Sequence, residues 1–185
     1  MKSIPDGARD EPSGTIKIIG IGQSLRGDDA AGLAAVRLWQ EKYQTDTTRP
    51  NLRVELAELP GIGLLSLLEG ASIAILVDAV RSDTKSGTIH ILSEDQLESF
   101  AAGTGSTHGW GVAETLALGR SLMPSTMPAS VILIGIEAGD LSLGASLSPE
   151  VEQSLPEVAR LIEQLVTSGQ RSDQDSSTSP RISPR

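Results

Sequence analysis

The segment TIKIIGIGQSLRGDDAAG, residues 15–32, sets the pattern that the rest of the chain follows. An apolar run rich in isoleucine leads into a turn with Gly22 and Gly27, and a helical pattern begins after the pair Asp28 and Asp29. A strand, a glycine-containing turn and a helix in this order form the first unit of an α/β domain. Two carboxylates stand at the position where such turns often bind phosphate.

Short apolar runs alternate with helical patterns along the chain. The expected strands are residues 15–22, 52–59, 72–80, 87–93 and 129–138, and the expected helices lie near 29–43, 62–69, 109–122 and 149–167. The runs at 72–77 and 131–136 are apolar on both faces, as central strands of a covered sheet are. Ser148 and Pro149 are typical of a helix start. We therefore expect a three-layer α/β domain, a twisted, mostly parallel sheet flanked by helices.

One domain is expected, residues 15–168, between two tails. Residues 1–14 and 169–185 contain too few apolar side chains to offset the entropy of ordering them, so we expect flexible tails.

The net charge of −9 disfavours nucleic acid as a partner and fits a metal centre or a cationic protein surface better. The chain has no cysteine, which excludes a thiolate metal site and a thiol nucleophile. Its apolar runs are shorter than the roughly 20 residues that span a bilayer, and its N-terminus does not resemble a secretory signal. We expect a cytoplasmic monomer.

Phosphate-binding templates do not fit the first turn. A dinucleotide fingerprint that starts at Gly20 needs its third glycine at position 25, which is Leu25. A Walker loop needs lysine and a hydroxyl residue where this chain has Asp28 and Asp29. Carboxylates repel phosphate, so the turn favours a cation. One aspartate is enough to cap the helix, and the other is open to a solvated or a functional role.

Three side chains are expected at the carboxyl edge of the sheet, where open parallel sheets bind ligands. Asp29 follows the first strand, Asp78 follows five apolar residues of a central strand, and His108 lies in a loop of small residues. A buried carboxylate is costly unless it is paired or bound to a cation. Two carboxylates and one imidazole form a metal set with open positions. The other histidine, His90, alternates with isoleucines and is expected on an exposed strand face.

These motifs resemble those of the hydrogenase maturation proteases, the endopeptidases that trim the large subunit of NiFe hydrogenases. The resemblance rests on GQSLRGDDAAG at 22–32, LVDAV at 76–80 and STHGWGVAETL at 106–116, and covers about residues 15–165. It implies a phosphorylase/hydrolase-like arrangement of a twisted sheet and flanking helices. Two positions depart from the family's usual residues: Gln23 stands where asparagine is usual, and Ala30 where glycine is.

The resemblance implies a single cleavage that removes a short C-terminal extension from the large-subunit precursor after nickel insertion. Asp29, Asp78 and His108 match the family's metal ligands, and they are expected to recognise nickel that the substrate supplies. Asp28 and Gln23 are expected to support the turn, Asp28 by capping the helix. The resemblance does not assign the group that attacks the peptide bond.

Two other functions stay open at this point. A receiver-type phosphoacceptor domain also has an acidic pair after its first strand. It needs a lysine at the end of a late strand, where ILIGIEAGD, residues 132–140, has Glu137 and Asp140 instead. A non-proteolytic, nickel-sensing assembly chaperone could use the same three ligands without cutting its partner.

Overall fold

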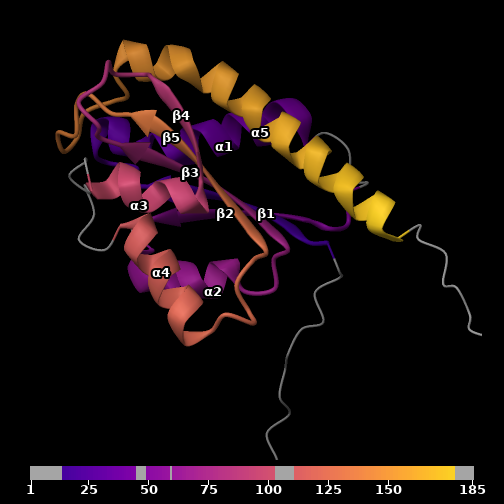
Figure 1. Cartoon of the computed structure of the whole chain (residues 1–185). Helices are drawn as coiled ribbons and strands as arrows, with labels where there is room; N and C mark the ends of the chain where they lie inside the picture. Colours follow the sequence, from indigo (N-terminus) through magenta and orange to yellow (C-terminus); the bar gives the residue numbers. More distant parts are fainter. Residues whose placement is uncertain (1–13, 45–48, 59, 103–110, 178–185) are drawn as a thin grey trace, which may run out of the picture.

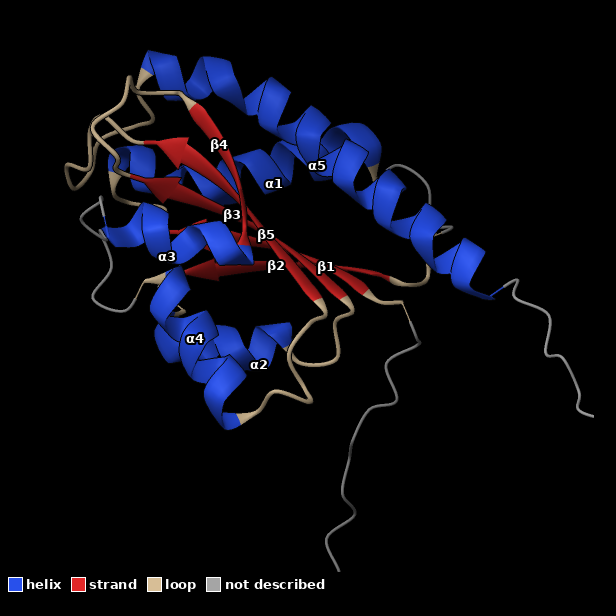
Figure 2. Cartoon of the chain, viewed as in Figure 1, coloured by secondary structure: helices blue, strands red, loops and turns tan. Residues whose placement is uncertain are grey.

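A five-stranded sheet forms the centre of the molecule (Figures 1 and 2). The computed structural model describes residues 14–44, 49–58, 60–102 and 111–177. The strands are β1 (Ile16–Gly22), β2 (Leu52–Glu58), β3 (Ile73–Val80), β4 (Ile89–Ser93) and β5 (Ser130–Glu137). Their order is β2-β1-β3-β5-β4, and every neighbouring pair is parallel except β4 and β5. The expected mostly parallel sheet is confirmed.

Helices cover both faces of this sheet (Figure 2). They are α1 (Ala31–Tyr43), α2 (Leu64–Leu68), α3 (Glu94–Ala102), α4 (Val112–Leu122) and α5 (Pro149–Ser177), with 3₁₀ turns η1 (Gly27–Ala30) and η2 (Gly61–Gly63). The helices α1 and α5 pack on one face, and α2, α3 and α4 on the other. The three-layer α/β architecture is therefore confirmed.

The central strands bury both of their faces, as their apolar sequences predict. On β3, Ile75 and Val77 belong to the core beneath α1 and α5, whereas Leu76 points into the core beneath α2 and α4. Trp39 of α1 is fully buried, and its Nε1–H donates to Glu163 of α5 at 3.1 Å. This bond joins the two helices of one layer while satisfying the indole donor.

Strand β4 runs against its neighbour because the connection that precedes it is short. Residues 81–88 join the end of β3 to the start of β4. A parallel crossover needs a dozen or more residues, so eight residues keep the start of β4 at the carboxyl edge of the sheet. The strand then pairs antiparallel with β5, for example His90 opposite Gly135. It closes one edge of the sheet.

Helix α3 has no counterpart in the sequence prediction, although the chain carries a signal for it. The Ser93 N–H donates to Gln96 Oε1 at 3.0 Å, which is half of a capping box. The serine–acid–acid–glutamine run at 93–96 therefore marks the start of this helix.

Helix α5 is longer than the expected helix at 149–167 and runs into the segment expected as a tail. The helix continues to Ser177. Gly169 is buried, and a Cβ on it would lie 2.9 Å from Ile73 Cδ1 and 3.0 Å from Ile16 Cδ1. The core thus continues past residue 168 because the helix still contacts the first residues of β1 and β3. The rest of the expected tails, 1–13 and 178–185, lies outside the described residues.

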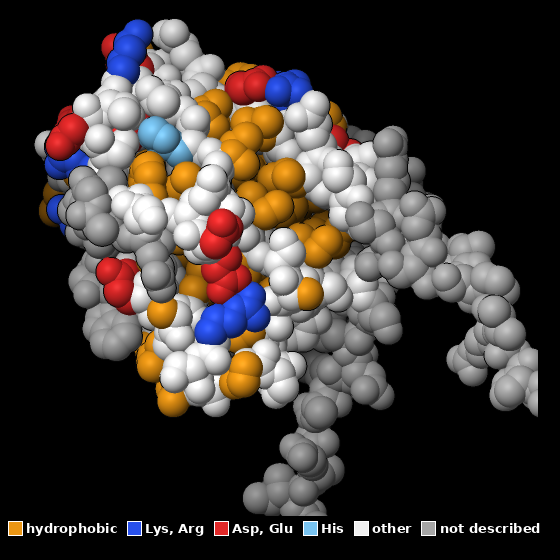
Figure 3. Space-filling view, in the orientation of Figure 1, with side chains coloured by type: hydrophobic (Ala, Val, Ile, Leu, Met, Phe, Trp, Pro, Cys, Tyr) orange, Lys and Arg blue, Asp and Glu red, His pale blue; other side chains and the backbone are white. Residues whose placement is uncertain are grey.

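The apolar face of α5 extends beyond the sheet. Ile91 of β4, with Leu161 and Leu165 of α5, lines a groove there, and Figure 3 shows apolar side chains gathered along this side of α5. Strand β4 has five residues and does not cover the long helix completely. In the part of the chain that the structure describes, no helix is both long and apolar enough to cross a membrane.

Candidate functional site

The turn that carries the acidic pair is shaped by close backbone contacts. Gly27 has φ 53°, and a Cβ there would lie 2.4 Å from the Asp140 carbonyl oxygen. At Gly32, a Cβ would lie 2.2 Å from the Val77 oxygen and 2.3 Å from the Ile21 oxygen. Because Gly27 lacks a side chain, the turn can lie directly against the loop after β5. Because Gly32 lacks one, the first residues of α1 can lie directly on the ends of β1 and β3.

Asp28 does not cap a helix, so that expectation is wrong. No side-chain bond caps η1 or α1. The fully buried Asp28 carboxylate instead accepts four hydrogen bonds from residues more than a hundred positions further along the chain. The donors are Gly139 N–H at 2.8 Å, Asp140 N–H at 2.9 Å, and Ser148 through its N–H at 2.6 Å and its hydroxyl at 2.9 Å. Asp28 thus joins the first turn to the loop after β5 and to the start of α5.

This network also sets the charge state of Asp28. Burial acts to raise the pKa of the carboxyl, but the hydrogen bonds to its charged form outweigh burial and hold the pKa below its ordinary value. The Ser148 hydroxyl, expected to cap α5, donates to Asp28. Asp28 is therefore a charged structural clamp, which supports the turn as expected but by a different set of bonds.

Asp29 and Asp78 are the two carboxylates expected to bind a metal. Both are buried. The Asp29 N–H donates to the Arg26 carbonyl at 3.0 Å, and its own carbonyl accepts from the Gln23 N–H at 3.2 Å, so the turn closes on itself. Asp78 Oδ1 accepts from the Ala79 N–H at 2.8 Å. Since η1 follows β1 and contacts β3, the structure brings both residues to the carboxyl edge of two neighbouring parallel strands.

The carboxylates of Asp29 and Asp78 supply some of the ligands that a divalent cation needs. Carboxylate oxygens bind such ions, and a cation offsets the cost of burying negative charge. Among the described residues, no group of three histidine, aspartate or glutamate side chains is arranged to hold a metal. The third expected ligand, His108, lies outside the described residues. Gln23 contributes backbone hydrogen bonds to the turn. A complete site therefore needs further ligands from this chain or from a substrate.

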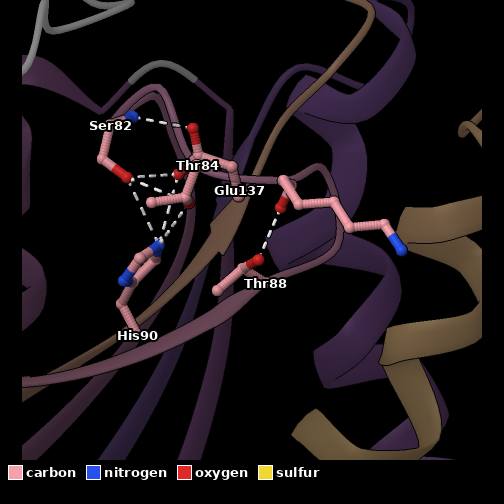
Figure 4. A network of polar contacts seen from close by, with 6 residues as sticks. Ser82, Thr84, Thr88, His90 and Glu137 are labelled. Atoms are coloured by element: carbon pink, nitrogen blue, oxygen red, sulfur yellow. Dashed lines mark hydrogen bonds and ion pairs between the residues drawn. The ribbon is translucent and has the colours of Figure 1, made fainter.

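A second polar cluster, the Glu137 network, lies at the same edge of the sheet (Figure 4). Glu137, at the end of β5, is buried and accepts from the Ser82 N–H and hydroxyl, both at 2.7 Å. His90 Nε2 lies 3.2 Å from Glu137 Oε2 and 3.3 Å from the Thr84 hydroxyl. Burial acts to raise the pKa of Glu137, but its hydrogen bonds outweigh burial and lower the pKa.

The expectation that His90 lies on an exposed face is wrong. Its side chain is 17% exposed, and its ring packs 5.2 Å from the ring of Phe100 on α3. The helix that covers His90 is α3, which the sequence prediction omitted. Asp78 and His90 both pair with Gly135 of β5, so they share one face of the sheet with a glycine between them. The signal that identified Asp78, a carboxylate at the end of an apolar strand, applies equally to Glu137.

The Glu137 network contains a serine, a histidine and an acid but lacks the geometry of a hydrolytic triad. In a triad the acid and the serine contact opposite nitrogens of the imidazole. Here Glu137 and Ser82 both contact Nε2, at 3.2 and 3.4 Å, and the serine hydroxyl donates to the carboxylate. The imidazole therefore cannot take the serine proton while the acid orients its other nitrogen. The cluster fixes the β3–β4 connection.

The sequence of this chain is similar to those of known proteins. A model of the hydrogenase maturation protease family matches residues 41–165. The chain belongs to this family. The hydrogenase expression/formation protein HoxM of Azotobacter vinelandii is 30% identical over 148 residues, which cover 79% of this chain and 69% of the relative.

Solved structures of maturation proteases share the fold. The hydrogenase maturating endopeptidase HybD from Escherichia coli matches with a TM-score of 0.71 and 23% identity, covering 85% of this chain and 93% of that one. The NiFe hydrogenase maturation protease HybD from Thermococcus kodakarensis matches with a TM-score of 0.67 and 29% identity, covering 82% and 98%. This maturation protease is accordingly a peptidase, a hydrolase of peptide bonds.

The receiver hypothesis is wrong on topology as well as on family. Receiver domains are entirely parallel with the order 2-1-3-4-5. In this maturation protease the order is β2-β1-β3-β5-β4, and β4 is antiparallel. Moreover, the end of β5, where a receiver needs a lysine, carries Glu137, whose carboxylate accepts a hydrogen bond from Ser82.

Proposed function

We propose that this maturation protease removes a C-terminal extension from the large-subunit precursor of a NiFe hydrogenase after nickel insertion. The carboxylates of Asp29 and Asp78, with the imidazole of His108, complete the coordination of the nickel that the precursor brings. The observation that supports this most directly is the placement of two buried carboxylates at one edge of neighbouring parallel strands, in a chain of this family.

The cost of buried charge explains why nickel loading would control cleavage. Asp29 and Asp78 are kept from bulk water, so a divalent cation stabilises both carboxylates more than a neutral peptide can. A precursor without nickel lacks this interaction and binds more weakly. Nickel(II) accepts oxygen and imidazole ligands, which matches the proposed set.

The residues around the ligands have supporting roles. Asp28 holds the turn that presents Asp29, and its hydrogen bonds to residues 139, 140 and 148 prevent the turn from shifting. Hydrolysis adds water to the carbonyl carbon of the cleaved bond and gives a proton to the leaving amine.

The test is the processing of purified precursor, with and without nickel, followed by mass spectrometry. We expect the nickel-loaded precursor to become shorter once and the nickel-free precursor to keep its mass. In Asp29→Asn and Asp78→Asn, processing should fall by at least about 100-fold, since even outer partners of metal ligands contribute about 10- to 100-fold. The exposed Glu69→Gln, which follows α2 near the amino edge of the sheet, is the control and should process normally.

His108 is tested in the same assay. His108→Ala should abolish processing and leave the melting temperature nearly unchanged, because His108 is expected in a loop, where one imidazole contributes little to the core. Normal processing by this variant would remove His108 from the site. Tight binding of nickel-loaded precursor without any shortening would contradict the protease function and favour a nickel-sensing chaperone.

A further inference from the structure

Two loops at the carboxyl edge, residues 23–27 and 139–147, are joined into one rigid unit. The Gly144 N–H donates to the Leu25 carbonyl at 2.7 Å, and the Gly27 N–H to the Ala145 carbonyl at 3.2 Å. Arg26 Nε donates to the Leu141 carbonyl at 3.3 Å. The Asp28 clamp adds further bonds, so the backbone of both loops has a defined position.

This unit exposes two large apolar side chains, one on each of the two joined loops. Leu25 is 71% exposed and Leu143 is 80% exposed. Their backbones are close in space because the residue after Leu143 donates its N–H to the carbonyl of Leu25. By contrast, Leu141 and Leu147 of the second loop pack against the core. We call Leu25 and Leu143 the leucine pair. Apolar side chains held rigidly in water, next to a site, are typical of an interaction surface.

The leucine pair lies next to the proposed ligand Asp29. Leu25 belongs to the same closed turn, in which the Asp29 N–H donates to the Arg26 carbonyl. A precursor segment that brings nickel to Asp29 therefore lies close to the leucine pair. Exposed carboxylates flank it, Glu58 beside Ser24 and Asp140 on the second loop. A segment that docks here is thus favoured if it is apolar with neutral or basic neighbours.

We propose that the leucine pair is a docking site for an apolar side chain of the large-subunit precursor, close to its nickel-bearing end. This inference rests on the proposed function. The pair contributes to binding and does not act on the reacting bond. Because the backbone is already ordered, docking orders few residues, which favours affinity.

The test compares Leu25→Ser/Leu143→Ser with the matched control Leu122→Ser. Leu122 is 69% exposed at the end of α4, near the amino edge of the sheet. Nickel-loaded precursor is titrated against each full-length protein to measure Kd, and processing is measured over a range of precursor concentrations. We expect the double variant to raise Kd and KM by about 10-fold or more, with the rate at saturation unchanged. Leu122→Ser should bind as the wild type does, and a Leu25→Met/Leu143→Met variant should keep the affinity within about threefold.

The outcomes separate docking from function. If the wild type shortens the precursor and the double serine variant has the same Kd and KM, the docking site is refuted and the protease function stands. If the wild type binds but does not cut, the protease function fails, while weaker binding by the serine variant still supports docking. An equal loss of affinity in Leu122→Ser would overturn the assignment to this surface.

Discussion

Asp28→Asn tests whether a buried charge holds the site turn in place. The substitution keeps the size of the side chain but replaces one carboxylate oxygen with an amide NH₂. If the NH₂ takes the place of Oδ1, only the Ser148 N–H loses its acceptor. If the NH₂ takes the place of Oδ2, three donors lose their acceptor: the Gly139 N–H, the Asp140 N–H and the Ser148 hydroxyl. The first orientation costs less, so we expect it to be adopted.

The expected magnitude follows from these bonds. One buried donor without an acceptor costs about 1–3 kcal/mol, and each remaining bond loses about 1 kcal/mol when its acceptor becomes neutral. Three bonds remain, so we expect the free energy of unfolding to fall by about 4–6 kcal/mol, which for a domain of this size lowers the melting temperature by about 10 °C or more. Urea unfolding at pH 7, followed by circular dichroism, measures this. Asp140→Asn, an exposed carboxylate on the adjoining loop, is the control and should unfold almost as the wild type does.

The pH dependence gives an independent check. The pKa of Asp28 in the folded protein is below the ordinary aspartate value of about 3.9. Its contribution to stability is therefore complete above that ordinary value and is lost as the pH falls through the folded-state pKa. The stability gap between wild type and Asp28→Asn should narrow as the pH is lowered from about 5 toward 3. A loss at pH 7 below about 1 kcal/mol, or a gap that does not change with pH, would refute the reasoning.

Two further substitutions test the rest of the edge. Glu137→Gln should lower the free energy of unfolding by about 2–4 kcal/mol, because two bonds from Ser82 lose their charged acceptor. Since the pKa of Glu137 is lowered on folding, the stability difference between the wild type and Glu137→Gln should be complete above about pH 4.3 and decline below it. An equal urea midpoint for the two proteins would show that the Glu137 network adds no stability. Gly32→Ala should cost about 3 kcal/mol or more, because its Cβ would overlap the carbonyl oxygens of Ile21 and Val77. If Gly32→Ala melts as the wild type does, α1 can move away from the ends of β1 and β3 without loss of stability.

Local patterns predicted most of the fold. The apolar runs that became β3 and β5 were identified as central strands, and both are covered by helices. Asp78 was identified because a carboxylate in such a strand is costly, and it is buried at the expected edge. The role of Asp28 could not be derived in this way. Its partners lie more than a hundred residues further along the chain, and the same local sequence is equally consistent with a helix cap.

The sequence by itself determined the alternation of strands and helices, the single acidic turn after the first strand, and the placement of Asp29 and Asp78 at one edge. These features follow from periodicity and from the rule that parallel strands end at a common edge. Only the tertiary structure decided that Asp28 clamps two loops, that α3 covers His90, and that the loops carrying Leu25 and Leu143 are joined. Each of these depends on which distant segments the sheet order brings into contact, and hydrogen bonds between such segments leave no periodic mark in the sequence.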